Sequence, residues 1–379
     1  MNFPGTVAES RRSTGKSSVD RRDFIRVCTL ALAAVGMPFS AAAEIARAVV
    51  EKKLKPSVIW LHFQECTGCT ESLLRTSHPA VSELILDLVS LDYCETLQAA
   101  AGHQAEAALK TAMKENAGKY ICVIEGAIPT KDDGIYCMIG DRTALEIVNE
   151  VARDAGAIIA IGSCASWGGI PSADPNPTGA SGAPKILQGK TVVTIPGCPA
   201  NPYNFLGVAL QYATYGTLPA LDEKGRPMFA YGRTIHEQCP RRAHFDAGRF
   251  ALQYGDEGHR LGYCLYKLGC KGPATHANCS TLHYGEVVDA WPIGVGHPCF
   301  GCTEQKLGFR VALHDTVDIE RPEPPDTYPP IQARQGRVSP IATGVAGLVG
   351  GALLGAGFMI SRKLDGKPPE DGAGTGKES

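Results

Sequence analysis

Ten cysteines and one histidine in this 379-residue chain fall into three groups of metal-binding side chains. The first group is Cys66, Cys69, Cys164 and Cys198. The second group is His236, Cys239, Cys264 and Cys270. The third group is Cys279, Cys299 and Cys302. Thiolates are the ligands that hold iron–sulfur clusters, so groups of four, four and three ligands predict a row of clusters that carries electrons.

The second and third groups depart from a set of four cysteines, and each departure has a chemical meaning. A neutral imidazole, here that of His236, leaves a cluster less negative than a thiolate would and raises its reduction potential, as in Rieske centres. Three thiolates suit a 3Fe–4S cluster, or a 4Fe–4S cluster whose fourth ligand lies outside the pattern. The nearby Pro292 and Pro298 cannot ligate. The other cysteines are interpreted as non-ligands: Cys28, Cys94, Cys122 and Cys137.

Structural zinc and disulfide bonds are the competing uses of so many cysteines. Structural zinc sites usually combine two local cysteine pairs, whereas the first group has one pair and two single cysteines. Exported cysteine-rich chains are usually held by disulfide bonds, but a chain of this length can fold without them. The alternative hypothesis is therefore an exported, membrane-anchored binding protein stabilised by zinc or disulfides, which would be colourless and free of acid-labile sulfide.

Apolar runs alternate with helical patterns between residues 57 and 216, which predicts a parallel sheet covered by helices. The predicted strands are Ser57–Phe63, Leu84–Leu91, Tyr120–Glu125, Ala157–Ile161 and Thr191–Ile195. The predicted helices are Glu106–Asn116, Ala144–Ala155 and Tyr203–Tyr215. The first group follows the first, fourth and fifth strands, and parallel strands end at one edge of a sheet. We therefore expect these four cysteines, far apart in sequence, to converge there.

The segment from about Arg226 to Glu320 has a different character. Its periodicity fades, and glycine, proline, tyrosine and histidine become more frequent. A segment so poor in regular structure packs weakly alone, and bound metal can supply the missing folding free energy. We expect a domain organised by its clusters.

The two ends of the chain carry targeting and membrane signals. RRDFIR at residues 21–26, an apolar stretch and small residues near 41–43 predict a twin-arginine export signal. The uncharged run 341–360 is long enough for one membrane-spanning helix, and its glycines at four-residue spacing suit a close helix partner. Basic residues after this run favour a cytoplasmic tail, so the body would lie on the periplasmic face of the bacterial inner membrane.

Several other function classes are excluded. The formal net charge of -2 provides no basic face for nucleic acid. No phosphate-binding glycine motif follows the first strand, and no histidine accompanies a nucleophile signature. The predicted chemistry is redox.

The motifs around the ligand groups resemble those of one protein family, the small, electron-transferring subunits of nickel–iron hydrogenases. They include ECTGCTES, GSCASWGG, PGCPANP, IHEQC, HFDAGRF, GYCLYKLGCKGP, NCSTL and WPIGVGHPCFGC. The resemblance extends from Arg21 to the membrane run, and it is greatest to membrane-associated uptake enzymes that couple hydrogen to the menaquinone pool. Quinone-reducing respiratory subunits resemble the first domain only, and the seven further ligands from His236 to Cys302 argue against them.

The resemblance implies a role for each group. The first group would hold a proximal 4Fe–4S cluster, the third a medial 3Fe–4S cluster and the second a distal 4Fe–4S cluster. A separate large subunit would split hydrogen at its nickel–iron centre, and the motifs RxCGxC and DPCxxC typical of that subunit are absent here. This chain would relay electrons to a membrane quinone-linked acceptor, with a membrane or ferredoxin-type electron-transfer subunit, or both, as a further partner.

The implied fold class is α/β, with a flavodoxin-like parallel-sheet domain, an irregular iron–sulfur domain and one C-terminal transmembrane helix. The expected segments are a twin-arginine signal peptide (1–43), the flavodoxin-like domain (54–225), the iron–sulfur domain (226–325), a linker (326–340), the transmembrane helix (341–360) and the tail (361–379).

One departure from the family pattern concerns oxygen. Oxygen-tolerant relatives carry two further cysteines around the proximal cluster, and the matching positions here are Gly68 and Gly169. We therefore expect an oxygen-sensitive enzyme, whose purified complex does not sustain hydrogen oxidation in air. Glu65, beside the first ligand, would either belong to a proton route or fix the ECTGC turn.

Overall fold

The computed structural model describes residues 55–330, apart from 78, 85–88, 285–286 and 321, together with residues 40 and 43. Contacts divide the chain into two compact units, 1–330 and 331–379. Nearly all of the predicted signal peptide, and all of the predicted transmembrane helix and tail, lie outside the described residues. Within the described part of the chain, no helix is both long and apolar enough to cross a membrane.

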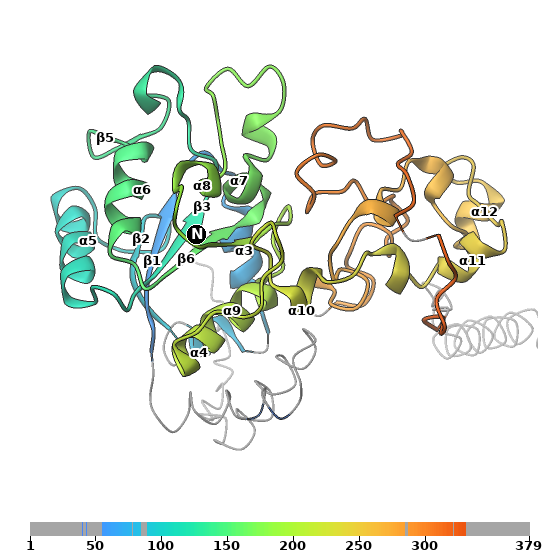
Figure 1. The fold of residues 1–379 in the computed structure, drawn as a ribbon, viewed down its shortest axis with the longest axis horizontal. Helices are drawn as coiled ribbons and strands as arrows, with labels where there is room; N and C mark the ends of the chain where they lie inside the picture. Colours follow the sequence, from blue (N-terminus) through green and yellow to red (C-terminus); the bar gives the residue numbers. More distant parts are fainter. Residues whose placement is uncertain are drawn as a thin grey trace, which may run out of the picture. The chain divides into compact units, whose positions relative to one another are not determined.

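A sheet of five parallel strands forms the centre of the first half of the body, with the order β2-β1-β3-β6-β7 (Figure 1). The strands are β1 (Ser57–His62), β2 (Ser90–Cys94), β3 (Ile121–Glu125), β6 (Ala157–Ile161) and β7 (Val192–Ile195). Numbered within this sheet alone, the order is 2-1-3-4-5, which is that of flavodoxin-like folds. The predicted parallel sheet is confirmed.

Four of the five predicted strands match closely, because their apolar runs are buried on both faces of the sheet. The prediction for the second strand was wrong, since the strand begins at Ser90 rather than at Leu84. This strand lies at an edge of the sheet and is only partly buried, so polar residues are tolerated in it. Asp92 accepts hydrogen bonds from the hydroxyls of Ser57 and Ser90. Leu84 itself lies in a helical turn, and residues 85–88 of the predicted strand lie outside the described residues.

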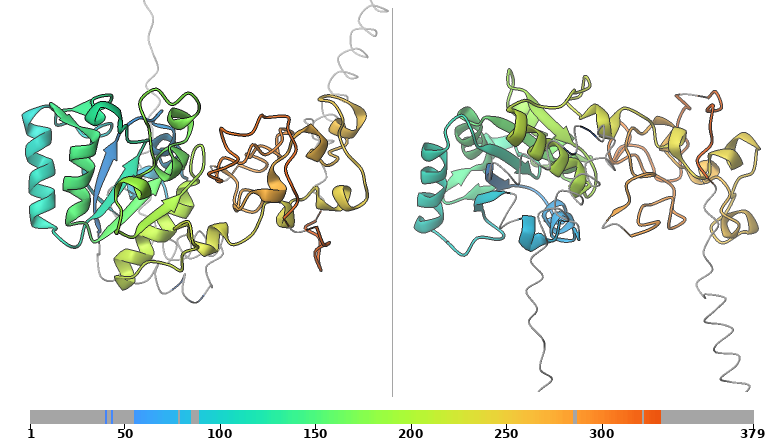
Figure 2. Two further views of the ribbon diagram at one scale, coloured as in Figure 1. Left: turned by 45° about the horizontal axis from the view of Figure 1, so that its top comes forward. Right: turned by 90° about the horizontal axis from the view of Figure 1, so that it is seen from below.

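Long helices cover both faces of the sheet (Figures 1 and 2). Helices α5 (His103–Glu115) and α6 (Ala144–Arg153) pack into one apolar core, and α9 (Pro202–Tyr215) packs into the other. Helix α6 begins at a capping box formed by Thr143 and Glu146, and α9 begins at Asn201, whose side chain accepts from the Tyr203 N–H. All three predicted helices are present within a few residues of their expected bounds.

Shorter elements connect this framework. In the first half they are α3 (Gly68–Leu74), α4 (Val81–Glu83), α7 (Gly162–Trp167), α8 (Ala183–Ile186), the hairpin of β4 (Met138–Ile139) and β5 (Arg142–Thr143), and the 3₁₀ turns η2 (Lys131–Gly134) and η3 (Ile170–Ser172). In the second half they are α10 (Met228–Tyr231), α11 (Arg242–Asp246), α12 (Glu257–Arg260), η4 (His236–Gln238), η5 (Tyr266–Leu268) and η6 (Gly272–Ala274).

The second half of the body is built almost entirely from loops and single helical turns, in keeping with its faded periodicity (Figure 2). Among its described residues no strand of a named sheet occurs, and only isolated bridges pair segments. The predicted boundary between residues 225 and 226 falls inside the compact unit 1–330. The division of the body into two domains therefore stays a prediction.

Candidate iron–sulfur sites

The first group of cysteines gathers at the carboxyl edge of the sheet. Cys66 follows β1, Cys69 lies in the first turn of α3, Cys164 lies in α7 and Cys198 follows β7. Burial raises the pKa of Cys164 to about 12, and the thiolates of Cys198 and Cys66 add to the rise. Burial likewise raises the pKa of Cys69, with further contributions from Glu125, Cys164 and Cys198. The structure thus places the four side chains close enough together for their charges to affect one another's pKa values.

Glycines leave room directly beside these sulfur atoms. A Cβ added at Gly162 would lie 2.5 Å from the Cys69 Sγ, and one at Gly169 would lie 2.7 Å from the Cys164 Sγ. Both glycines have positive φ, of 83° and 49°, which other residues rarely adopt. A bulky inorganic group next to the thiols needs such space, so the residues fit an iron–sulfur cluster.

Glu125 holds part of the first group in place, a role that was not predicted from the sequence. It ends the apolar strand β3, and its side chain is almost completely buried. Its carboxylate accepts from the Cys69 N–H at 3.0 Å, from the Thr70 hydroxyl at 2.6 Å and from the Trp60 indole at 3.0 Å. The bonds from Cys69 and Thr70 fix the beginning of α3, and with it the position of Cys69, while the bond from Trp60 holds the carboxylate to β1. A lone acid at the end of an apolar strand was the available signal.

Glu65 contributes to the turn between Cys66 and Cys69. Its Oε1 accepts from the Thr67 hydroxyl at 3.1 Å and lies 3.3 Å from the Nδ1 of His62. Thr67 has a φ of 60°, so the turn is held in a left-handed conformation that needs support. These contacts favour the interpretation of Glu65 as a turn-fixing acid, and the proton route stays a prediction.

The four side chains of the second group line one small cavity. The Nε2 of His236 is buried and has no hydrogen-bond partner among the described residues. Burial, with the nearby charge of Arg242, lowers the pKa of this imidazole to about 4, so the ring is neutral near pH 7, as a metal ligand must be. Phe245 packs edge-on against the ring, with 4.5 Å between the centroids. A neutral ring with an Nε2 unpaired within the described part of the chain, fixed by its contact with Phe245, suits the role of a cluster ligand.

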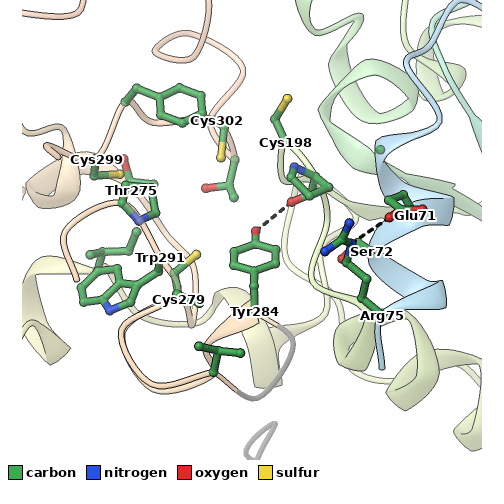
Figure 3. A pocket seen from close by; sticks show the side chains of 18 residues that line it. Glu71, Ser72, Arg75, Cys198, Thr275, Cys279, Tyr284, Trp291, Cys299 and Cys302 are labelled. Carbon is green, nitrogen blue, oxygen red and sulfur yellow. Dashed lines mark hydrogen bonds and ion pairs between the residues drawn. The ribbon is translucent and has the colours of Figure 1, made fainter. Parts of the chain in front are cut away.

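The three cysteines of the third group line a larger cavity of about 790 Å³. Figure 3 shows them around this cavity, with Cys198 of the first group on its opposite side. The Tyr284 hydroxyl donates to the Pro199 carbonyl at 2.7 Å and so bridges the two sides. Glu71 also lines the cavity, but it pairs with Arg75 at 2.8 Å.

Backbone contacts tie the third group to each of the others. The Ser163 hydroxyl donates to the Cys302 carbonyl at 2.6 Å and accepts from the Gly197 N–H at 3.1 Å, which joins the first and third groups. The Lys271 N–H donates to the Cys299 carbonyl at 2.7 Å, which joins the second and third. These bonds place the third group next to each of the other two, an arrangement that suits a row with the third group in the middle.

A buried ion cluster fixes the end of the third ligand loop. Glu304, two residues after Cys302, accepts from Arg226 at 2.6 Å and from Lys224 at 2.5 Å. Its Oε1 also accepts from the His276 N–H at 3.0 Å. Burial alone would raise the pKa of Glu304, but the bonds from His276, Lys224 and Arg226 hold it at about 2. The carboxylate stays charged and fastens the loop to both neighbouring segments.

Other arrangements of the cysteines find no support in the described part of the chain. All 13 cysteines described are free thiols. No three histidine, cysteine or acidic side chains among the described residues are placed to hold a single metal ion.

Comparison with known proteins decides the family. Residues 66–212 match the family model described as NADH ubiquinone oxidoreductase, 20 Kd subunit, and residues 231–314 match the model of the C-terminal part of NiFe/NiFeSe hydrogenase small subunits. The chain is 49% identical to the Hydrogenase-2 small chain of Escherichia coli strain K12 over 356 residues, which are 94% of this chain and 95% of that protein. The chain belongs to the family of nickel–iron hydrogenase small subunits.

Two further members agree with this assignment. The uptake hydrogenase small subunit of Azotobacter vinelandii is 43% identical over 338 residues, which are 89% of this chain and 91% of that protein. The reduced, active nickel–iron–selenium hydrogenase of Desulfomicrobium baculatum has a chain that matches with a TM-score of 0.65 and 32% identity, covering 69% of this chain and all of that one. The predicted resemblance to hydrogenase small subunits is confirmed, and the match to residues 231–314 argues against a respiratory subunit with the first half alone.

Within this hydrogenase small subunit, Gly68 and Gly169, both beside cysteines of the first group, differ in the room they offer for a side chain. A Cβ at Gly68 would lie 3.1 Å from the Cys66 Sγ and touch little else, whereas one at Gly169 would meet the backbone N and Cα of Cys164 at 2.8 Å. We expect Gly169→Ala to destabilise the body by at least about 1–2 kcal/mol, because the positive φ is also strained. Gly68→Ala, the matched control, should be milder. Thermal unfolding of both variants checks this, and equal midpoints would contradict it.

Proposed function

We propose that this chain is the electron-transfer subunit of a nickel–iron hydrogenase complex. It relays electrons between the hydrogen-activating centre of the large subunit and a membrane quinone-linked acceptor. The observation that carries the proposal is the row of three ligand groups, in which Cys302 belongs to the same cavity as Cys198 and the Lys271 backbone links Cys270 to Cys299. A continuous row suits a conductor better than three separate structural sites.

The donor sets support one assignment of clusters. The first group would hold a proximal 4Fe–4S cluster, the second a distal 4Fe–4S cluster with His236 as its nitrogen ligand, and the third a medial 3Fe–4S cluster. These clusters, when bound, supply reversible one-electron transfer. Two other potential ligands that line the medial cavity have partners already, Glu71 in Arg75 and the Tyr284 hydroxyl in the Pro199 carbonyl, which favours three ligands there.

The protein's own contribution is to fix and shield the sulfur atoms. Each group has at least one cysteine that is less than a tenth exposed, namely Cys69, Cys239 and Cys299, so water is partly excluded from each group. Glu125 holds the Cys69 backbone, and the Ser163 and Lys271 bonds hold the backbones of Cys302 and Cys299. Rigid ligands change little between oxidised and reduced states, which lowers the reorganisation that each transfer requires.

The setting proposed for the complex follows from the chain ends and from the family. The twin-arginine motif at residues 21–26 would export the folded chain, and the apolar run 341–360 would anchor it to the periplasmic face of the inner membrane. Its partners would be the hydrogenase large subunit and, toward the acceptor, a membrane or ferredoxin-type electron-transfer subunit, or both.

Metal and sulfide analysis of the complex purified from membranes tests the proposal. We expect about 11 irons per small subunit, as four, three and four, and about 12 acid-labile sulfides, after correction for the large subunit's iron. Low-temperature EPR of the oxidised complex should include the signal of a 3Fe–4S centre. Zinc without sulfide would instead support the anchored binding protein, and about eight irons without that signal would remove the medial site.

A further inference from the structure

A fully buried lysine lies between the second and third groups. Lys271 has no exposed surface, although its side chain ends in an amine. Its Nζ donates to the backbone carbonyls of Gly269 at 3.1 Å, Ala312 at 2.8 Å, Leu313 at 3.1 Å and Asp315 at 3.2 Å. Within the described part of the chain, the hydrogen bonds of this amine go to carbonyl oxygens and not to a carboxylate.

This set of acceptors selects the charged form of the side chain. An ammonium group has three donors and no lone pair, whereas a neutral amine would direct a lone pair at one of the carbonyl oxygens. Four carbonyl dipoles around Nζ therefore stabilise the cation without neutralising it. The result is a net positive charge inside the protein. Such a charge changes the reduction potential of a neighbouring redox group more than a surface charge does.

Lys271 occupies the junction of two ligand loops. It directly follows Cys270 of the second group, and its N–H donates to the Cys299 carbonyl of the third group at 2.7 Å. A Cβ placed on Gly301 would lie 3.5 Å from the Lys271 Cβ, so the side chain also passes beside the turn that leads to Cys302. The same charge is thus close to ligands of both groups.

We propose that Lys271 is a positioning residue of the relay, whose buried ammonium raises the reduction potentials of the clusters held by the second and third groups. The inference rests on the proposed function. Each cluster gains one negative charge when it accepts an electron that originates from hydrogen, and a fixed positive charge nearby favours that reduced state. The carbonyl bonds also hold residues 312–315 over the junction.

Potentiometric titration of the purified complex, followed by low-temperature EPR, tests this role. The variant is Lys271→Met, which keeps the aliphatic stem and removes the charge. The matched control is Lys267→Met, which removes an exposed lysine from the same loop. We expect Lys271→Met to shift the midpoint potentials of the medial and distal clusters to more negative values and to leave the proximal one nearly unchanged. The shift should persist at high salt, because a buried charge is poorly screened, while Lys267→Met should cause little shift.

The possible outcomes separate this inference from its alternatives. Unchanged midpoints in Lys271→Met with full iron and sulfide content would overturn it. If Lys271→Met loses its clusters, Lys271→Arg is measured instead, because arginine keeps the charge. Retained clusters with near-native midpoint potentials in Lys271→Arg would support the inference. Loss of the clusters in both variants would overturn it, because the shape of the side chain would then matter more than its charge. Absence of the 3Fe–4S signal from the unmodified complex would instead be a failure of the proposed function.

Discussion

Replacing Cys164 with serine should abolish electron transfer from hydrogen to an external dye. Cys164 is the one member of the proposed first group that α7 carries, and burial, with the nearby charges of Cys198 and Cys66, raises its pKa. Serine offers a harder oxygen ligand that suits iron–sulfur clusters poorly. Loss of outer-shell partners alone costs about 10–100-fold, so loss of a ligand should lower the rate by more than about 100-fold. Dye reduction under hydrogen measures this, and iron should fall by about four per chain.

Cys137→Ser is the matched control for this prediction. Cys137 is a half-buried free thiol outside the three groups, so its replacement changes the same atom without touching a proposed ligand. Iron content and dye reduction should stay near those of the unmodified complex. Native iron content and activity in Cys164→Ser would show that the first group holds no essential cluster.

Glu304→Ala should give the largest loss of stability among single substitutions outside the ligands. Its side chain is only 6% exposed and faces Arg226, which is 4% exposed. Removing the carboxylate leaves the guanidinium buried with Asp222 as its remaining ion-pair partner. Breaking a buried pair from one side costs about 3–5 kcal/mol, much more than the pair itself contributes. The loss should appear as a lower denaturant midpoint when unfolding is followed by bleaching of the clusters.

Asp154→Ala provides the comparison at the surface. Asp154 pairs with Arg153 at 3.2 Å, but both side chains are more than half exposed. Exposed pairs contribute about 0–1 kcal/mol, so this variant should unfold close to the native midpoint. If Glu304→Ala behaved like Asp154→Ala, the ion cluster would have no special part in holding the third ligand loop.

The position of the first group could be predicted because it depends on regular structure. Apolar runs locate the strands, parallel strands end at one edge, and Cys164 and Cys198 follow β6 and β7 by three residues each. The order of the three groups in space had no such basis in the periodicity. In the second half, neighbouring segments are joined by single hydrogen bonds between loops, and these leave no repeating pattern in the sequence. The order came from family resemblance alone.

The buried charges were missed for a related reason. Glu125 bonds to the Cys69 N–H across 56 residues, and Glu304 bonds to Arg226 across 78 residues. Lys271 reaches Ala312 across 41 residues. An acid or a lysine in a loop is usually solvated, and only the tertiary partner distinguishes a buried charge from a surface one. A single sequence does not reveal partners at such separations.

The proposed order of the three groups in space differs from the order in which they are completed along the sequence. The first group is complete at Cys198 and the second at Cys270, but the third, which lies between them, is complete only at Cys302. The loop that carries Cys299 and Cys302 is therefore synthesised after both of its hydrogen-bond partners, Lys271 and Ser163. A chain cut short between residues 270 and 302 would contain every ligand of the first and second groups but only part of the third. A relay through all three groups therefore requires synthesis at least as far as residue 302.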